Sequence, residues 1–271
     1  MVESSSATAV LDKSRAGSQT PRGKVIVVMP AMNAAATLDG TVAGIPRECV
    51  DEIILVDDAS ADETVKAARR LPLHVVWHPH NAGYGANQKT CYLQALQRDA
   101  DVVVMLHPDG QYEPALIPRM IEPILAGDAD LVLGSRLAEP GMAIANGMPR
   151  WKWVANRFLT ICENRVMGTH LSEAHTGYRA YSRRLLLTVP FLRNSNDFVF
   201  DSELIMQAVH FDMRIVEVPA AGRYFEDMSS VRFKAGVVYG TKTLWAAARL
   251  VLHRRGILSS SKFKNPGREP A

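Results

Sequence analysis

The sequence has few cysteines and no long uninterrupted hydrophobic segment. Its 271 residues include only Cys49, Cys91 and Cys162, which lie far apart and form no Cys-x-x-Cys pair. Three separated cysteines argue against a disulfide framework or a thiolate zinc site, and they favour a reducing cytoplasm. No segment reaches the ~20 apolar residues that a membrane-spanning helix needs. With 47% hydrophobic and 22% charged residues, the chain is expected to form one large domain with a substantial core.

Basic residues are concentrated near the C-terminus. The net charge is +3, but seven Lys and Arg residues and one acid, Glu269, lie between Lys242 and the end of the chain. Four of these bases interrupt the apolar segment 235–258, so we expect a basic amphipathic helix and tail over 236–271. Such a tail can lie on an anionic membrane surface, or it can be a solvated terminal helix. No nucleic-acid-reading motif accompanies the charge, so we expect no nucleic-acid partner.

The chain is organised as a leader followed by alternating strands and helices. Residues 1–23 are rich in Ser and Ala and lack an apolar signal segment, so we expect a disordered leader. The alternation predicts an α/β fold with a mostly parallel sheet, covered by helices on both faces. Strands are expected at 24–33, 50–60, 73–79, 101–110, 130–136 and 213–225, and helices at 34–45, 61–71, 83–99, 113–127, 150–167, 182–189 and 201–211.

Polar and glycine residues follow each of the first four predicted strands. The carboxyl ends of parallel strands meet at one edge of a sheet, where open α/β folds bind ligands. We call the polar segment that follows a strand its exit. A single polar exit is compatible with ordinary turn chemistry, as Pro-Asp-Gly at 108–110 illustrates. Four polar exits at one edge indicate a ligand site. They contain Pro30, Asn33, Asp57, Asp58, Ser60, His80, Asn81, Gly83, Gly85, His107, Asp109 and Gln111.

Six short motifs occur in a characteristic order. They are VVMPAMNAAATL (27–38), DEIILVDDASADET (51–64), HNAGYGANQKT (80–90), LHPDGQYEP (106–114), LVLGSR (131–136) and EAHTGYRAYSRRLL (173–186). Together they resemble the inverting glycosyltransferases of family 2, and within that family the polyprenyl-phosphate (dolichyl-phosphate) sugar synthases. The resemblance covers residues 24–232 and implies a GT-A fold, a Rossmann-like single domain over 24–235. It further implies a nucleotide-binding half over 24–135 and an acceptor half over 136–235.

The resemblance implies that the nucleotide binds at the exits of the first three strands. A carboxylate is a suitable acceptor for the vicinal hydroxyls of a ribose, although Asp58 can also cap a helix. Glycine lets the backbone approach a nucleotide closely, although Gly83 can equally belong to a plain turn. The implied nucleoside- and nucleotide-binding residues are Pro30, Asn33, Asp57, Asp58, Asn81, Gly83 and Gly85.

The exit of the fourth strand is implied to hold a divalent ion. The family has Asp-x-Asp and a glutamine two residues further on at the sugar diphosphate, and here these positions are His107, Asp109 and Gln111. Alternate residues of an extended strand share a side, so the three can converge. The expected ion is Mg²⁺ or Mn²⁺, and the imidazole in place of the first carboxylate suits Mn²⁺ better. His107 can instead be a hydrogen-bonding neighbour of the metal site.

Four arginines are implied to contact phosphate groups of the donor or the acceptor, because guanidinium groups match phosphate oxygens. They are Arg136, Arg150, Arg179 and Arg223. The implied catalytic residues are Asp109, Glu173 and Arg136. A hydroxyl acceptor needs a base, and Glu173 stands where the family has an aspartate, whereas a phosphate acceptor is already an anion. Glu173 can also anchor the acceptor or pair with a helix end.

The implied function is transfer of a sugar, with inversion, from a UDP- or GDP-sugar to a polyprenyl phosphate. Two alternatives stay open: a soluble or lipid hydroxyl acceptor, and a catalytically silent nucleotide-sugar binding module, suggested by His107. Where the family has Arg…Ser-Lys near the lipid phosphate, this chain has Arg223 and Ser230 without a following lysine. We expect a cytoplasmic protein, peripheral on the inner membrane surface if the acceptor is a lipid.

Overall fold

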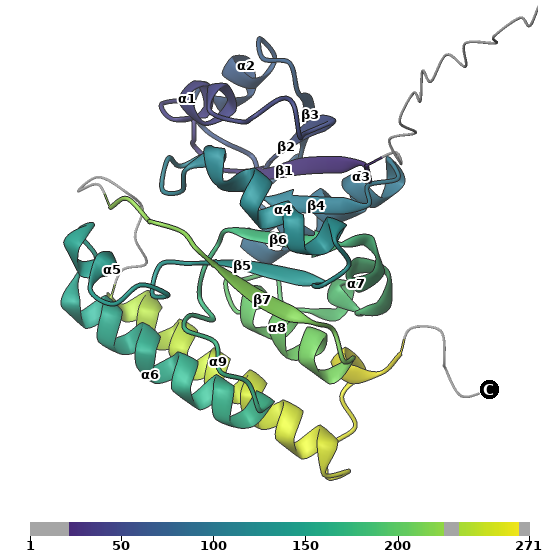
Figure 1. Cartoon of the computed structure of the whole chain (residues 1–271), viewed down its shortest axis with the longest axis vertical. Coiled ribbons are helices and arrows are strands. Elements are labelled where there is room, and N and C mark those ends of the chain that lie inside the picture. Colours follow the sequence, from purple (N-terminus) through teal and green to yellow (C-terminus); the bar gives the residue numbers. More distant parts are fainter. Residues whose placement is uncertain (1–21, 225–232, 266–271) are drawn as a thin grey trace, which may run out of the picture.

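The computed structural model describes residues 22–224 and 233–265 (Figure 1). Residues 1–21 of the predicted leader therefore lie outside the described part, as do Ser230 and the end of the basic tail, 266–271. The central feature of the described part is a seven-stranded sheet. Its strands are β1 (Val25–Ala31), β2 (Glu52–Asp57), β3 (His74–Trp77), β4 (Val102–Met105), β5 (Leu131–Ser135), β6 (Arg179–Ser182) and β7 (Ile215–Pro219).

The sheet is mostly parallel, as the sequence predicts. Its strand order is β3-β2-β1-β4-β6-β5-β7. β6 pairs antiparallel with both β4 and β5, and the other neighbouring pairs are parallel. The carboxyl ends of β1, β2, β4 and β5 therefore lie at the same edge of the sheet. A residue that follows any of these four strands emerges at that edge.

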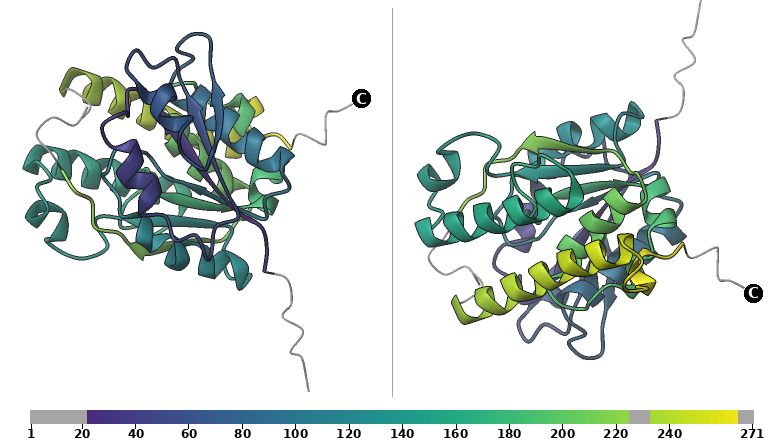
Figure 2. Two further views of the ribbon diagram at one scale, coloured as in Figure 1. Left: turned by 90° about the horizontal axis from the view of Figure 1, so that it is seen from above. Right: turned by 90° about the horizontal axis from the view of Figure 1, so that it is seen from below.

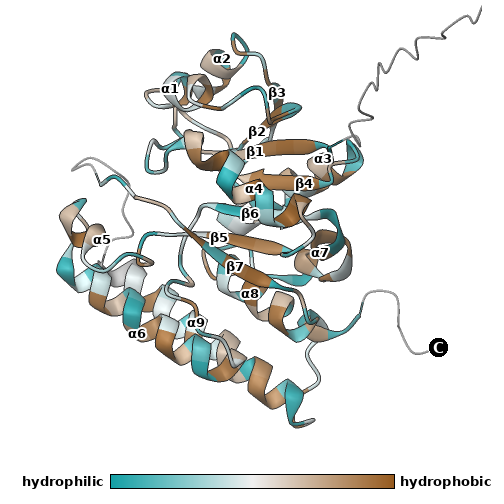
Figure 3. Cartoon of the chain, viewed as in Figure 1, coloured by the Kyte–Doolittle hydropathy of each residue, from teal (hydrophilic) through white to brown (hydrophobic). Residues whose placement is uncertain are grey.

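Helices cover both faces of the sheet (Figure 2), and the apolar strands lie between them (Figure 3). Successive strand residues point to opposite faces, so β1 contributes Ile26 and Val28 to one core and Val27 and Met29 to the other. α3, α8 and α9 close the first core, and α1, α2 and α4 close the second. The helices are α1 (Leu38–Ala43), α2 (Thr64–Ala68), α3 (Tyr84–Gln97), α4 (Ile117–Leu125), α5 (Met142–Ala145), α6 (Arg150–Met167), α7 (Arg183–Thr188), α8 (Phe200–His210) and α9 (Phe233–Arg254), with short 3₁₀ turns η1 (Pro114–Leu116), η2 (Phe191–Arg193) and η3 (Ser261–Phe263).

α6 and α9 lie side by side along one side of the molecule (Figures 1 and 2). The methyl groups of Leu159 in α6 face Gly240 in α9. Ala246, Ala247 and Leu250 of α9 are buried in the first core, so the helix expected for the basic tail packs against the body of the protein. Among the described helices, none combines the length and the apolar character that crossing a bilayer requires.

Candidate active site

The loops that follow β1 and β4 meet the start of α3 at the carboxyl edge of the sheet. The Thr37 hydroxyl, after β1, donates a 2.5 Å hydrogen bond to the carbonyl oxygen of Pro108, after β4. The Tyr84 hydroxyl, at the start of α3, lies 3.2 Å from Nε2 of His107. The loop before β6 joins them, because a Cβ on Gly177 would lie 2.9 Å from Cδ2 of His107. Segments far apart in the sequence therefore form one continuous surface.

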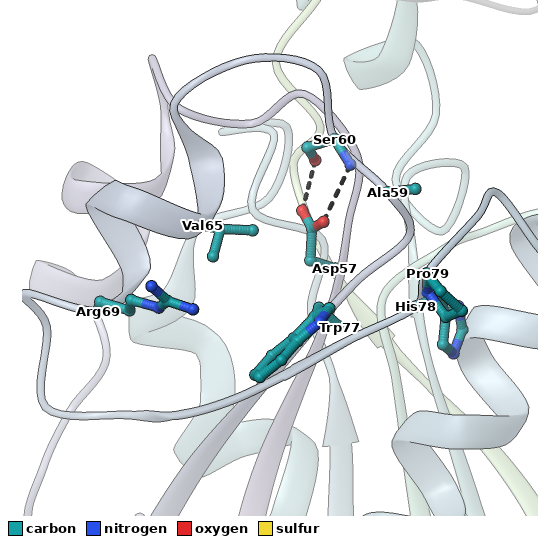
Figure 4. A pocket seen from close by; sticks show the side chains of 8 residues that line it. All are labelled: Asp57, Ala59, Ser60, Val65, Arg69, Trp77, His78 and Pro79. Carbon is teal, nitrogen blue, oxygen red and sulfur yellow. Dashed lines mark hydrogen bonds between the residues drawn. The ribbon is translucent and has the colours of Figure 1, made fainter.

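Asp57 and Asp58, at the end of β2, are both buried but face different neighbours. Asp57 accepts hydrogen bonds from the backbone N–H of Ser60, at 2.9 Å, and from the Ser60 hydroxyl (Figure 4). It borders an open cavity of about 400 Å³ between the ends of β2 and β3, and Asp58 does not line this cavity. The lining residues are Asp57, Ala59, Ser60, Val65, Arg69, Trp77, His78 and Pro79.

Asp58 holds the loop that leads into α3. One carboxylate oxygen accepts the N–H of Ala82 at 2.8 Å and lies 2.7 Å from Nδ1 of His78. The other oxygen accepts the N–H of Gly83 at 3.0 Å. Asp58 is only 3% exposed. Asp58 therefore caps neither α2 nor α3, since the N–H groups that it binds precede the first residue of α3. Its carboxylate instead orders the loop before α3.

Gly83 and Gly85 allow a close approach of protein backbone. Gly83 has a φ of +98°, and a Cβ there would lie 2.6 Å from the carbonyl oxygen of Asn196. A Cβ on Gly85 would lie 2.4 Å from the carbonyl oxygen of Ser195, and the Gly85 N–H donates to the Asn196 carbonyl at 2.8 Å. Contact with segment 195–196 therefore explains both glycines without a nucleotide.

The remaining nucleoside candidates lie at the surface beside this loop, except for Pro30, which is buried in β1. Asn33 and Asn81 are exposed. Asn33 has a φ of +53°, and its side-chain oxygen accepts the N–H of Ala61 at 2.9 Å. The Asn81 amide lies 3.2 Å from the sulfur of Met32. The loops after β1, β2 and β3 are thus tied together, with two exposed amides between them.

His107 is held by a tyrosine. Tyr84 stacks on the His107 ring, with centroids 5.5 Å apart, and its hydroxyl donates to a carboxylate oxygen of Asp201 at 2.8 Å. Because that bond uses the hydroxyl proton, the 3.2 Å contact with Nε2 requires His107 to donate its Nε2–H to the Tyr84 oxygen. In this tautomer of the neutral imidazole, Nδ1 carries a lone pair and can bind a metal ion.

Asp109 and Gln111 supply oxygens next to His107. The Asp109 carboxylate is partly exposed, and one of its oxygens accepts the N–H of Gln111 at 2.9 Å. The second oxygen makes no hydrogen bond to the described residues. Among those residues, no group of three His, Cys, Asp or Glu side chains is close enough to hold a metal by itself. The donor set fits an ion that takes one carboxylate from the protein and its other ligands from water and a diphosphate.

Arg136 and Glu173 form a buried ion pair beside this surface. Nε of Arg136 donates to Glu173 at 3.0 Å, and its Nη2 also bonds the carboxylate. Burial would raise the pKa of Glu173, but the charge and hydrogen bonds of Arg136, with a bond from Asn156, hold it below the usual value. Burial would lower the pKa of Arg136, but Glu173 and the neighbouring tyrosines Tyr112 and Tyr224 hold it well above the usual value. Both groups therefore stay charged, and Glu173 is a poor base.

Arg179 differs from the expectation that it contacts a phosphate. It is fully buried, and its guanidinium donates to the carbonyl oxygens of Thr176 at 2.8 Å, Asp201 at 3.0 Å and Ala174 at 3.2 Å. No accessible surface is left for a phosphate. Arg179 instead fixes the loop between Glu173 and Gly177, and we leave it out of the phosphate-binding set.

Arg150 and Arg223 are both exposed. The N–H of Arg223 donates to the carbonyl oxygen of Gln111 at 2.8 Å, which places Arg223 beside the fourth-strand exit. Arg150 begins α6. These two arginines remain accessible to a phosphate, in contrast to Arg179.

Lys152 and Tyr224 belong to the same cluster, although the sequence did not single them out. The Tyr224 hydroxyl accepts a 2.9 Å hydrogen bond from Nη1 of Arg136, and the Lys152 ammonium lies 5.8 Å from the Tyr224 ring centroid. Burial, and then the charge of Arg136, lower the pKa of Lys152. The sequence held one indication of the role of Lys152, because helical spacing places it on the inner side of α6. The other polar residues on that side are Asn156, Thr160 and Glu163.

Comparison with known proteins identifies the family. The pattern of Glycosyl transferase family 2 matches residues 26–189, from β1 through α7. The chain belongs to glycosyl transferase family 2. The protein is therefore a glycosyltransferase, as the motifs predicted. His107, Asp109, Arg136 and Glu173 all lie inside the matched region, whereas Arg223 lies beyond it.

Relatives of this glycosyltransferase include enzymes of lipid-linked sugar synthesis. It is 29% identical over 210 residues to the polyprenol monophosphomannose synthase of Mycolicibacterium smegmatis, covering 73% of this chain and 77% of that protein. It is 30% identical over 207 residues to the undecaprenyl-phosphate mannosyltransferase of Micrococcus luteus, covering 72% and 82%.

The fold of the glycosyltransferase is shared with a solved enzyme. Glucosyl-3-phosphoglycerate synthase from Mycobacterium tuberculosis, in complex with UDP, superimposes with a TM-score of 0.65 at 22% identity, covering 88% of this chain and 82% of that chain. The same enzyme in complex with Mn²⁺, UDP-glucose and phosphoglyceric acid gives a TM-score of 0.61. This likeness confirms the predicted GT-A fold.

Proposed function

We propose that this glycosyltransferase transfers a sugar, with inversion, from a UDP- or GDP-sugar to a polyprenyl phosphate. The observation that carries the proposal is the state of Glu173, which is fully buried and bonded to Arg136 and Asn156. An acceptor that is already an anion needs no base, so an immobilised carboxylate at this position suits a phosphate acceptor. The relatives named for polyprenol and undecaprenyl phosphate support the same acceptor class.

We further propose that the donor diphosphate lies over the fourth-strand exit. Asp109 would bind a divalent ion through its free oxygen, with Nδ1 of His107 and the Gln111 amide as the remaining protein groups. Such an ion, Mg²⁺ or Mn²⁺, would stabilise the negative charge that develops on the departing nucleotide. The Mn²⁺ and UDP-glucose of the structurally similar M. tuberculosis enzyme support this assignment.

The acceptor phosphate is proposed to bind among Arg223, Lys152 and Arg150. Arg223 and Arg150 are exposed, and Lys152 lies beside Tyr224 and Arg136. These cations would hold a phosphate oxygen facing the anomeric carbon, opposite the leaving diphosphate, which is the geometry of inversion. Arg136, tied to Glu173, would keep Tyr224 in place and contribute positive potential rather than a free guanidinium.

A catalytically silent binding module is the second candidate, and His107 is the observation that favours it. An imidazole in place of a carboxylate removes one negative charge from the metal site, and one of its ring nitrogens is already bonded to Tyr84. Titration calorimetry separates the two: donor binding without turnover for every acceptor would establish the module.

Transfer of labelled sugar tests the proposed function. The purified protein is incubated with Mn²⁺, one labelled nucleotide sugar at a time, and either undecaprenyl phosphate or undecaprenol, which lacks only the phosphate. The proposal predicts label in the lipid phase with undecaprenyl phosphate alone, and an inverted anomeric configuration in the product by NMR. Transfer to undecaprenol, or only to a soluble acceptor such as 3-phosphoglycerate, would contradict it.

A further inference from the structure

The outer face of α6 exposes large apolar side chains, whereas its inner face buries several polar ones. Four large side chains of α6 are about half exposed: Trp151 (45%), Val154 (57%), Phe158 (57%) and Ile161 (53%). Their spacing of three and four residues puts them on one side of the helix. The buried side of the same helix carries three polar residues, Asn156, Thr160 and Glu163, together with Leu159 and Met167. A surface helix that faces water usually exposes polar side chains, so the large apolar side chains on the outside of α6 need another explanation.

The candidate active site explains the inner face. The Asn156 amide donates to Glu173 at 2.8 Å, and the Glu163 carboxylate lies 3.0 Å from Nε2 of His175. From α9, the Tyr239 hydroxyl lies 2.6 Å from Nδ1 of the same histidine. The polar side chains thus support the loop that contains Glu173. Nothing in the site accounts for the apolar side chains on the outside.

α9 adds a second apolar stripe next to the first. Its exposed large side chains are Val237 (53%), Val238 (53%), Leu244 (38%) and Trp245 (54%). The Arg249 guanidinium lies 5.8 Å from the Trp245 ring centroid. The two helices run side by side on the underside of the molecule, and apolar residues occur along both (Figures 2 and 3). We call these eight side chains of α6 and α9 the α6–α9 face.

The charges around the α6–α9 face are mostly positive. α6 carries Arg150, Lys152, Arg157 and Arg165, and α9 carries Lys242, Arg249 and Arg254. Lys242 is paired with Asp197. The one acid on the described residues of these two helices, Glu163, is 1% exposed and faces His175. Tryptophan and aliphatic side chains flanked by Lys and Arg are typical of helices that lie in the interface of an anionic membrane.

We propose that the α6–α9 face docks on an anionic lipid bilayer, with α6 and α9 lying in the plane of the headgroups. The proposal assigns a surface and an orientation, and it rests on the proposed function only for the identity of the acceptor. Lys152, in the first turn of α6, lies beside Tyr224. Docking therefore brings the proposed acceptor cations to the headgroup level, where the phosphate of a membrane lipid lies.

A second copy of the chain is a poorer occupant of this face. Self-association through the α6–α9 face would bring the arginines of two copies together, and neither helix exposes an acid among its described residues that could pair with them. Like charges at close range oppose such an interface. An anionic bilayer satisfies the apolar and the cationic parts of the face together.

Flotation with vesicles tests the proposal. The full-length protein is mixed with phosphatidylcholine vesicles that contain no phosphatidylglycerol or about 30% of it. We expect binding to the anionic vesicles, a decrease at high salt, and little binding to the neutral ones. No donor and no polyprenyl phosphate is present, so the outcome is independent of the transfer assay described above.

A matched pair of variants locates the surface. Val154→Glu with Phe158→Glu alters the α6–α9 face, whereas Leu187→Glu with Leu192→Glu places the same charges at equally exposed positions, 58% and 54%, on α7 and η2. The first variant should bind anionic vesicles at least about tenfold more weakly than the unmodified protein. The second should bind them with nearly the affinity of the unmodified protein. Circular dichroism and melting temperature check that both variants fold.

Three results would overturn the proposal. They are absence of binding by the unmodified protein, equal binding by the two variants, and a dimer in light scattering that the first variant dissociates, which would assign the face to self-association. Where the first variant fails to fold, brominated lipids provide the test in the unmodified chain. Quenching of tryptophan fluorescence that is reduced in Trp245→Phe supports docking, and an absence of quenching contradicts it.

Discussion

Asp109 and Glu173 are carboxylates near the same edge of the sheet, yet their surroundings give them different properties. Glu173 is fully buried, and Arg136 and Asn156 bond its oxygens, so it stays ionised and fixed. Asp109 is partly exposed, and within the described part of the chain its carboxylate accepts one hydrogen bond, from the N–H of Gln111. At the residue scale, Asp109 is therefore the group available to a cation, and Glu173 orders the loop around it.

Asp109→Asn tests that assignment. The asparagine side-chain oxygen can still accept the N–H of Gln111, so the turn should persist, but the negative charge is lost. We expect sugar transfer to fall at least a hundredfold, with about the same melting temperature, because one charged metal ligand is removed. Titration calorimetry should show that Asp109→Asn also binds Mn²⁺ more weakly than the unmodified protein does. Activity near that of the unmodified protein would remove Asp109 from the mechanism.

Tyr84→Phe tests the role of the hydroxyl that holds His107. The variant keeps the stacked ring and loses the bonds to His107 and Asp201. With one hydrogen bond worth about 1 kcal/mol, we expect Mn²⁺ affinity to fall about fivefold. Tyr92→Phe is the matched control, since the Tyr92 hydroxyl is also buried but bonds Gln88 and Tyr181. Equal Mn²⁺ affinity in the two variants would show that His107 does not act at the metal.

Glu173→Gln tests the buried ion pair. Loss of the charge leaves Arg136 buried without its partner, which should lower the free energy of unfolding by about 3–5 kcal/mol near neutral pH. The pKa of Glu173 is lower in the folded protein than in the unfolded chain. Its contribution is therefore present above an unfolded pKa of about 4.3 and lost as the pH falls through the folded pKa.

Urea unfolding at several pH values measures this effect. The difference between the unmodified protein and Glu173→Gln should shrink below about pH 4.3. Glu122→Gln, at an exposed position in α4, is the control and should change stability by less than about 0.5 kcal/mol. A pH-independent difference would mean that the pair does not depress the pKa of Glu173.

Residue types and local order could be read from the sequence, but burial could not. The motifs placed His107, Asp109 and Arg136 after strands that end at one edge. They could not show that Arg179 is enclosed by backbone carbonyls, or that Gly83 and Gly85 lie against segment 195–196, because both depend on contacts between parts of the chain that only the folded structure brings together. The helical spacing of Lys152 and Glu163 was visible in the sequence, but the sequence could not show that this side of α6 faces the interior of the protein.

At the element scale, long and strongly patterned elements were predicted well and short ones less well. α6 spans 150–167 as expected, whereas α1 and α2 occupy only Leu38–Ala43 and Thr64–Ala68 within longer predicted segments. The flanking residues of these two helices are engaged in loop contacts, such as the Asn33 and Ala61 bond. Local helical spacing could not anticipate that these loops would bond to each other.

The start of α3 gives a prediction at this scale. Gly85→Ala would place a methyl group 2.4 Å from the Ser195 carbonyl oxygen, so α3 and the 195–196 segment must separate. We expect a loss of about 2–4 kcal/mol in unfolding free energy, together with weaker donor binding. Gly40→Ala in α1 is the control, since nothing lies within 4 Å of an added Cβ there, and it should be neutral or slightly stabilising. Equal stability in the two variants would contradict the close approach.

At the scale of the whole molecule, the candidate site and the α6–α9 face belong to one arrangement of strands and helices. Parallel strands bring the exits of β1, β2, β4 and β5 to one edge, and α6 and α9 support the Glu173 loop beside it. The family assignment identifies the chemistry as glycosyl transfer. We propose that this reaction takes place at the carboxyl edge of the sheet. The same two helices then present the α6–α9 face on their outer side.

A crystal structure with Mn²⁺ and a bound UDP- or GDP-sugar tests this placement most directly. We expect the diphosphate at the carboxyl edge, with the metal bound to Asp109 and the nucleoside next to the loop that Asp58 orders. A donor bound elsewhere, for example in the cavity of about 540 Å³ lined by Met167, His170 and Glu217, with Asp109 free of metal, would contradict it.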